Sequence, residues 1–191
     1  MYLKHGLLYL LAKVAPAVAS FVTLAAYTRW MSTAEYGIFS TILVLASSTT
    51  LFVFGWLYVG IMRFWDQRAL TATAAGQLIT LSVASLGLLV GLISLGAAWW
   101  TGQWAVATGF FAVFISAAFY EAYQRINSIT LQVKSYVWTE LGRTFVTLVS
   151  GMALVGAGYA WKGAVGAVVW GFSVVLVLSG ALWQQFAWQW R

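Results

Sequence analysis

Long stretches without a charged residue dominate the chain and predict membrane-spanning helices. The longest runs from Ala69 to Tyr120 and contains no Asp, Glu, Lys or Arg over 52 residues. One helix needs about 20 residues to cross a bilayer, so this stretch fits two helices joined by a turn. The polar break nearest its middle is Thr101-Gly102-Gln103. The pattern therefore predicts helices at about 74–98 and 104–127.

Shorter uncharged runs predict the remaining helices. These lie at about 6–28, 34–63, 136–160 and 163–187. The runs are continuously apolar, whereas strands of a membrane barrel alternate apolar and polar residues. A helix also satisfies its own backbone groups in lipid. We therefore expect an all-α integral membrane protein, with residues 1–191 forming a single bundle of six transmembrane helices.

The composition agrees with a membrane protein and excludes several functions. Hydrophobic residues make up 62% of the chain and charged residues only 7%, against about 25% charged residues in soluble domains. Such a chain cannot cover a water-facing surface. Cysteine is absent and His5 is the one histidine, so thiolate or histidine chemistry lacks its parts. We expect no enzymatic activity, no metal and no cofactor.

The distribution of basic residues predicts the orientation. An even number of helices puts both termini on the same side of the membrane. Eight of the ten Lys and Arg residues fall on that side: Lys4, Lys13, Arg63, Arg68, Arg125, Lys134, Arg143 and Arg191. Arg29 and Lys162 fall on the other. Basic residues favour the cytoplasmic side, so we expect both termini in the cytoplasm. The net charge of +6 then reflects orientation and contact with membrane lipid, not nucleic acid.

The N-terminal segment has a second interpretation. Lys4 and His5, an apolar stretch and then Ala17-Val18-Ala19 are similar to a cleavable signal peptide. Against cleavage, Lys13 interrupts the apolar core and hydrophobicity continues to Ala26. We expect this segment to be retained as the first membrane helix.

Charged residues inside the predicted helices are the first candidates for function. Lys13, Arg63 and Glu121 lie within or at the ends of apolar segments. Ionisable residues at membrane depth are unfavourable unless they face a cavity or a partner. Long basic side chains near helix ends can instead extend to the interface. Both interpretations stay open for Lys13 and Arg63. Glu121 has Arg125 one turn on, so it is either part of a structural ion pair or a candidate for cavity lining or coupling.

Four consecutive hydroxyl residues are the second candidates. Ser47, Ser48, Thr49 and Thr50 fall in the middle of a predicted helix. Together they cover every face of that helix, so at least one must point away from lipid. They can line a hydrated cavity, or they can bond to neighbouring helices or to their own backbone.

A sequence motif lies between the first two predicted helices. Ser32 and Glu35 fit a capping box, in which each residue satisfies a backbone N–H of the other at a helix start. The whole string reads Thr28-Arg29-Trp30-Met31-Ser32-Thr33-Ala34-Glu35-Tyr36-Gly37-Ile38-Phe39-Ser40. It resembles the N-terminal signature of the polysaccharide flippases, which include the O-antigen flippases of lipopolysaccharide biosynthesis. They belong to the multidrug/oligosaccharidyl-lipid/polysaccharide exporter superfamily. Within this signature, we expect Ser32, Glu35 and Gly37 to have a structural role in this chain.

The resemblance implies a function. Members move lipid-linked oligosaccharides across the bacterial inner membrane by alternating access, and cationic side chains in their cavity hold the substrate phosphates. The matching positions in this chain are Lys13, Arg29 and Arg63. Members have two helical halves and this chain resembles the N-terminal one. The resemblance thus implies either a homodimer or a separate C-terminal half.

Two other functions remain compatible with the residues. One is a six-helix transporter or channel subunit of another type, and the other is a membrane scaffold without transport activity. Short loops and scattered small residues fit all three functions.

Overall fold

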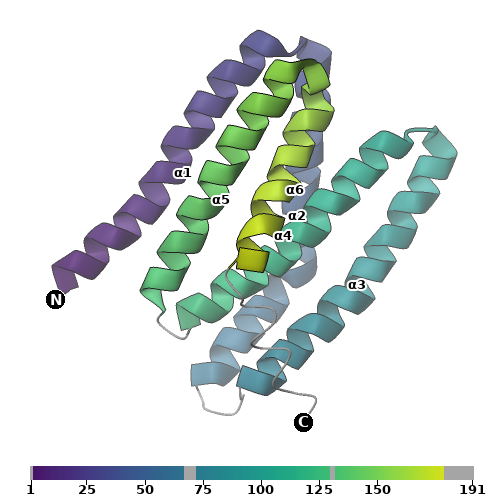
Figure 1. Cartoon of the computed structure of the whole chain (residues 1–191). Coiled ribbons are helices and arrows are strands. Elements are labelled where there is room, and N and C mark those ends of the chain that lie inside the picture. The colour runs from purple at the N-terminus through teal and green to yellow at the C-terminus, as the bar shows by residue number, and fades with distance from the viewer. Residues whose placement is uncertain (1, 67–71, 130–131, 179–191) are drawn as a thin grey trace.

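The computed structural model describes residues 2–66, 72–129 and 132–178, and this part of the chain is helical without a strand (Figure 1). The prediction of an all-helical fold is confirmed for these residues. The elements are α1 (Tyr2–Trp30), α2 (Thr33–Asp66), α3 (Ala72–Thr101), α4 (Trp104–Ile129), α5 (Val133–Leu154), the π-helical turn η1 (Val155–Tyr159) and α6 (Ala160–Leu178). Each helix runs back along the bundle relative to the one before it.

Four stretches of the described chain are long and apolar enough to cross a membrane. They are Thr33–Phe64, Gln77–Thr101, Trp104–Ser128 and Val133–Leu178. Large apolar side chains also cover the outer surface; on α3, for example, Leu81, Leu88 and Leu92 are all exposed. Such a surface suits lipid and not water. The fold therefore indicates a membrane protein.

The last of these stretches is 46 residues long and bends in its middle. A straight helix of that length would measure about 70 Å, twice the thickness of a bilayer core. The backbone reverses at Gly158 (φ 89°) and Ala160 (φ 48°), and α6 packs back along α5. The sequence placed this break at about 160–163, slightly too late. The predicted end of the last helix, at 187, lies outside the described residues.

Glycines let α1, α5 and α6 approach one another closely. A Cβ atom on Gly171 of α6 would collide with the Thr147 hydroxyl and lie 3.1 Å from the carbonyl oxygen of Arg143. A Cβ atom on Gly151 of α5 would collide with the hydroxyl of Tyr27. Small residues at such crossings are a common basis of helix packing in membranes.

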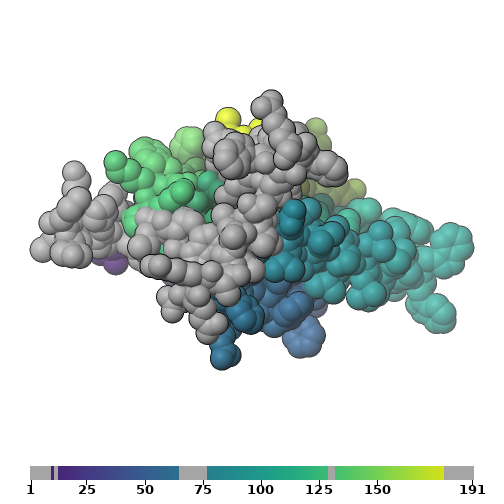
Figure 2. Space-filling model, turned by 90° about the horizontal axis from the view of Figure 1, so that it is seen from below, coloured from purple at the N-terminus to yellow at the C-terminus, as the bar shows by residue number. Residues whose placement is uncertain are grey.

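The helices pack unevenly, and this creates a space inside the bundle. α1 packs along α5, but it touches α2 little and diverges from it away from their shared turn (Figure 1). α3 packs mainly on α4, and Figure 2 shows these two segments extending to one side of the molecule. Stacked rings of Phe54 and Phe114, with centroids 5.9 Å apart, join α2 to α4. The gap between α1 and α2 is the site of the main cavity described below.

Replacing Gly171 with Ala tests the close crossing of α5 and α6. The added methyl group has no room beside Thr147, so we expect the free energy of unfolding to fall by about 1–3 kcal/mol. Gly166 lies on the same helix, and a Cβ atom there would meet nothing within 4 Å. Gly166→Ala is therefore the matched control. Thermal unfolding in detergent measures both, and equal stabilities would contradict the crossing.

Candidate functional site

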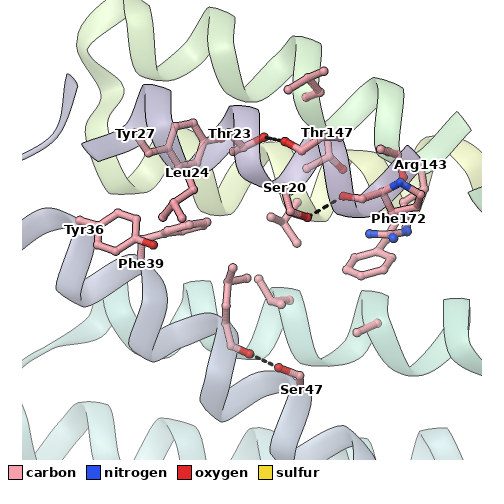
Figure 3. Close-up of a pocket in the computed structure, with 18 residues that line it drawn as sticks. Ser20, Thr23, Leu24, Tyr27, Tyr36, Phe39, Ser47, Arg143, Thr147 and Phe172 are labelled. Atoms are coloured by element: carbon pink, nitrogen blue, oxygen red, sulfur yellow. Dashed lines mark hydrogen bonds between the residues drawn. The ribbon is translucent and has the colours of Figure 1, made fainter. Parts of the chain in front are cut away.

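A cavity of about 340 Å³ lies between α1 and α2, with α4, α5 and α6 at its back (Figure 3). Its size falls within the usual range for small-molecule sites. The lining side chains are mostly apolar or hydroxyl-bearing: Pro16, Ala19, Ser20, Thr23, Leu24, Tyr27, Tyr36, Phe39, Leu43, Ser47, Val113, Ala117, Arg143, Thr144, Thr147, Leu148, Val168 and Phe172. Ser20 and Ser47, on its two flanking helices, are exposed. The cavity therefore opens to the outside between α1 and α2.

Arg143 is the one charged side chain among the described residues that line this cavity. It lies ten residues after Val133, the start of α5, which corresponds to about 15 Å along the helix axis. That is half the thickness of a bilayer core. An arginine within a stretch that could cross a membrane is unfavourable without partners and is by default a candidate for function.

Three side chains hold Arg143 in place. Its Nη2 atom donates to Oε1 of Glu140, one turn earlier on α5, at 2.5 Å. Its guanidinium carbon lies 5.3 Å from the ring centroids of both Tyr120 on α4 and Phe172 on α6. Ion pairing and aromatic contact each favour a desolvated guanidinium. Only 23% of the Arg143 side chain is exposed, so its position is fixed by packing.

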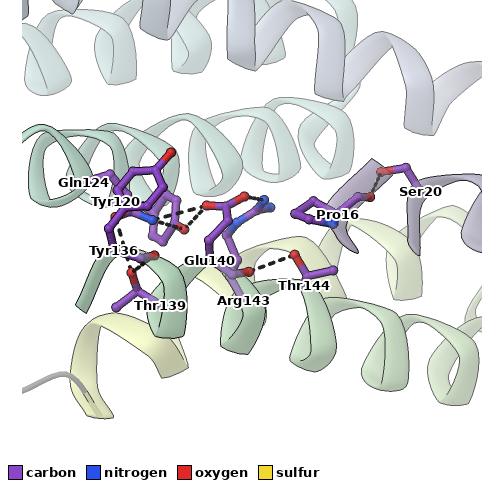
Figure 4. A network of polar contacts seen from close by, with 9 residues as sticks. All are labelled: Pro16, Ser20, Tyr120, Gln124, Tyr136, Thr139, Glu140, Arg143 and Thr144. Carbon is purple, nitrogen blue, oxygen red and sulfur yellow. Dashed lines mark hydrogen bonds and ion pairs between the residues drawn. The ribbon is translucent and has the colours of Figure 1, made fainter. Parts of the chain in front are cut away.

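Glu140 is in turn the centre of a polar network between α4 and α5 (Figure 4). The hydroxyl of Tyr120 and the amide of Gln124 both donate to its Oε2 atom, the amide at 3.2 Å. The Gln124 amide also donates to the Tyr120 oxygen at 2.6 Å. Thr139 donates to the Gln124 carbonyl at 3.3 Å. The carboxylate thus has three donors, as a buried charge requires.

The hydroxyls of the cavity use their protons within their own helices. Ser20, Thr23 and Thr144 donate to the carbonyl oxygens of Pro16, Ala19 and Glu140, each at 2.8 Å. Ser47 donates to the carbonyl of Leu43 in the same way. A hydroxyl has a single proton to donate, so these groups offer a ligand only lone pairs. The Arg143 guanidinium is therefore the one charged hydrogen-bond donor on the described lining of the cavity.

Three polar atoms around this cavity are buried and have no hydrogen-bond partner in the described part of the chain. They are the hydroxyls of Tyr27 and Thr147 and the Nε atom of Arg143. Unpaired buried polar atoms are uncommon in folded proteins. The hydroxyls of Tyr27 and Thr147 lie in the close helix crossings at Gly151 and Gly171, which accounts for their burial.

The cationic residues singled out from the sequence do not converge in this chain. Arg29 is exposed at the end of α1, beside the start of α2, and Arg63 is exposed near the end of α2. The length of α2 between them is about 45 Å by the helix rise. Lys13 is exposed on α1, with its ammonium 5.7 Å from the ring centroid of Tyr136 on α5. Glu121 is half-buried on α4. The described lining of the main cavity includes none of these side chains.

The four hydroxyl residues of α2 point in different directions. Ser47 lines the main cavity, while Thr49 lines a smaller one between α2, α3 and α4. Thr50 is buried and donates to the carbonyl of Ala46 at 2.8 Å. Ser48 is exposed. The expectation that at least one faces away from lipid thus holds for Ser47, Thr49 and Thr50.

The capping box forms at the start of α2. The Ser32 amide donates to the Glu35 carboxylate at 2.9 Å, and the Glu35 amide donates to the Ser32 hydroxyl at 3.3 Å. Gly37 lies in the first turns of α2, where a Cβ atom would meet nothing within 4 Å. The motif of residues 28–40 therefore comprises the end of α1 and the capped start of α2.

Sequence reasoning missed Glu140 and misplaced Arg143. A predicted helix start at 136 put Arg143 near the surface, where it counted as a residue of the cytoplasmic side. A usable signal was present: Tyr120 and Gln124 are four residues apart and Glu140 and Arg143 are three apart, so each pair shares a helix face. Two such polar pairs on consecutive apolar helices are typical of a buried network.

Comparison with known proteins adds no relative: no protein-family model, no curated protein and no solved structure matches this chain. The resemblance to polysaccharide flippases therefore depends on the motifs quoted above.

Breaking the ion pair tests its place in the fold. Glu140→Leu leaves the Arg143 charge buried without its counter-ion, so we expect a loss of about 3 kcal/mol or more in the free energy of unfolding. Replacing both residues, as Glu140→Leu with Arg143→Leu, removes the unpaired charge and restores much of that stability. Unfolding in detergent measures both variants. A double variant no more stable than the single one would show that the two charges are not coupled.

Proposed function

We propose that this protein is a membrane transport protein that binds the anionic headgroup of a lipid-like substrate beside Arg143. The observation that carries this proposal is the position of Arg143, a single guanidinium in an otherwise apolar and hydroxyl-lined cavity at membrane depth. A guanidinium matches the oxygens of a phosphate group in charge and in geometry. The opening between α1 and α2 gives a lipid chain a lateral route to this charge.

In this proposal the chain crosses the membrane six times, with both termini in the cytoplasm. α1 then counts as a span in addition to the four stretches above, and α5 and α6 count separately. The distribution of exposed cations supports the orientation. Arg63, Arg125 and Lys134 lie at one end of the bundle, and Arg29 and Lys162 lie at the other. The first end is cytoplasmic by the positive-inside rule.

The substrate class follows from the resemblance of residues 28–40 to the polysaccharide flippases. We infer that the substrate is a lipid-linked oligosaccharide, moved across the bacterial inner membrane by alternating access. In flippases of this kind the cavity lies between two halves. A second copy of this chain, or a separate C-terminal half, then covers the open side of the cavity between α1 and α2. Lys13, Arg29 and Arg63 do not line the described cavity, so in this proposal they contact parts of the substrate that extend beyond it.

Binding of a simple anionic lipid tests the role of Arg143. We expect purified protein in dodecyl maltoside to bind dihexanoylphosphatidylglycerol, and Arg143→Gln to weaken binding at least about tenfold through loss of a charge-assisted hydrogen bond. Arg125→Gln is the matched control, because Arg125 also lies beside a tyrosine ring, that of Tyr58 at 5.8 Å, but outside the cavity. Isothermal titration calorimetry measures the affinities. Equal binding of dihexanoylglycerol, which lacks the phosphate, would contradict the proposal.

Transport is tested separately in vesicles. Protein reconstituted with a trace of fluorescent phosphatidylglycerol should speed the transfer of this lipid between leaflets, measured by chemical quenching of the outer leaflet. The Arg143→Gln variant should transfer it more slowly at the same protein level. Equal rates with the variant, or with vesicles that hold no protein, would argue for a scaffold.

A further inference from the structure

The guanidinium that the proposed function requires is already occupied by a carboxylate. Glu140 does not line the cavity; it lies behind Arg143 and takes one of its N–H groups. The inference below rests on the proposed function, because it concerns what happens to this carboxylate when an anion arrives. Before binding, the site holds one positive and one negative charge within a segment of apolar helices.

Adding an anion to this site alone would leave two negative charges beside one guanidinium at membrane depth. Like charges that share a site of low dielectric constant repel strongly, and such a site usually keeps one of the two groups protonated. If Glu140 binds a proton at the same time, the site has one positive and one negative charge both before and after binding. The membrane interior then gains no net charge.

The network around Glu140 accommodates both forms of the carboxyl group. In the charged form it accepts from Arg143, Tyr120 and Gln124. In the neutral form its own proton needs an acceptor. The Tyr120 hydroxyl can supply one, because a phenol oxygen both donates and accepts.

The helices packed against α5 bring few other titratable groups to Glu140. α4 contributes Tyr120. α6 brings no titratable group near Glu140: it presents Phe172 to Arg143, and its one charged residue, Lys162, lies at the opposite end of that helix. α1 contributes Lys13, which lies over the ring of Tyr136, one turn before Glu140 on α5. Arg143 is therefore the charge that decides the protonation of Glu140.

A column of polar side chains connects Glu140 with the end of the bundle. The single proton of the Thr139 hydroxyl is shared between the Gln124 carbonyl oxygen, at 3.3 Å, and the backbone carbonyl of Ser135, at 2.8 Å. The Ser135 hydroxyl lies 3.0 Å from the hydroxyl of Tyr123. Ser135 is the third residue of α5, next to the turn between α4 and α5. These contacts place a line of polar groups between this end of the bundle and Glu140.

We propose that Glu140 is a proton-binding site coupled to the cavity, and that it takes up one proton from solvent when an anion binds Arg143. The proton adds to the carboxylate oxygen, and the anion takes the place of the carboxylate as the counter-ion of the guanidinium. Ligand and proton therefore bind together, and the protein carries them as a neutral pair.

Calorimetry on the purified wild-type chain tests the proposal with dihexanoylphosphatidylglycerol as the probe. Its phosphodiester keeps a single negative charge between pH 5 and pH 8, so any proton taken up binds to the protein. Titrations in two buffers of different ionisation enthalpy give the number of protons. At a pH where Glu140 of the free chain is ionised, we expect uptake of about one proton per lipid bound. The affinity for the lipid should then fall about tenfold for each unit by which the pH rises.

Two variants sharpen the result. Glu140→Gln resembles the protonated carboxyl, so it should bind the lipid without proton uptake and with an affinity that does not change with pH. Glu121→Gln removes another carboxylate of the bundle, one whose side chain does not line the cavity, and should behave as the wild type. A wild-type chain that binds the lipid without taking up a proton overturns the proposal even if Glu140→Gln fails to fold.

The failures are distinguishable. Binding by the wild-type chain without proton uptake, at an affinity constant from pH 5 to pH 8, would overturn the coupling and leave the proposed function standing. The same proton uptake in Glu140→Gln would assign it to another group and also overturn the coupling. A wild-type chain that does not bind the probe at any pH would overturn the proposed function and the coupling with it.

Discussion

Arg143 can lie inside an apolar bundle because its guanidinium pairs with one carboxylate and packs against two aromatic rings, and those partners come from three helices. Glu140 is on the same helix, Tyr120 is on α4 and Phe172 is on α6. A buried charge that lost any of them would be hard to tolerate, so this contact constrains how α4, α5 and α6 pack. Gly171 serves the same constraint, because it lets α6 come within contact of the Arg143 backbone. The cavity exists where these three helices are held together and α1 and α2 are not.

The helices were predictable because their signal is local. An uncharged run marks a membrane helix whatever its neighbours are, and the break at Thr101-Gly102-Gln103 separates α3 from α4 where the sequence placed it. The errors lie where tertiary structure decides. α5 begins at Val133 and not at 136, and the bend into α6 falls at residues 155–160. The bend falls at Gly158, whose positive φ suits a glycine, but glycines are frequent in this chain, so their presence alone did not locate the turn.

The functional site was less predictable, because it depends on which helices face each other. Charges at membrane depth drew attention to Lys13 and Arg63, yet both side chains have room to extend outward and both are exposed. Arg143 was counted with the surface cations although it is the charge that lines the cavity. The four hydroxyl residues of α2 were candidates for lining a cavity. Ser47 lines the cavity between α1 and α2, and Ser48 does not. Contacts between α4 and α5, which create the network of Glu140, have no counterpart in a single helix pattern.

The intrahelical bonds of the cavity hydroxyls have a consequence for selectivity. Because Ser20, Thr23, Ser47 and Thr144 have already donated their protons, these parts of the cavity wall offer a ligand only lone pairs. The lining groups that keep a proton to donate are Arg143 and a few hydroxyls: those of Tyr27, Tyr36 and Thr147. A ligand whose polar groups only accept hydrogen bonds therefore finds few partners, whereas a polyol can bring its own protons to several walls. The cavity can therefore discriminate between two ligands of equal size and equal charge by the number of hydroxyl groups they carry.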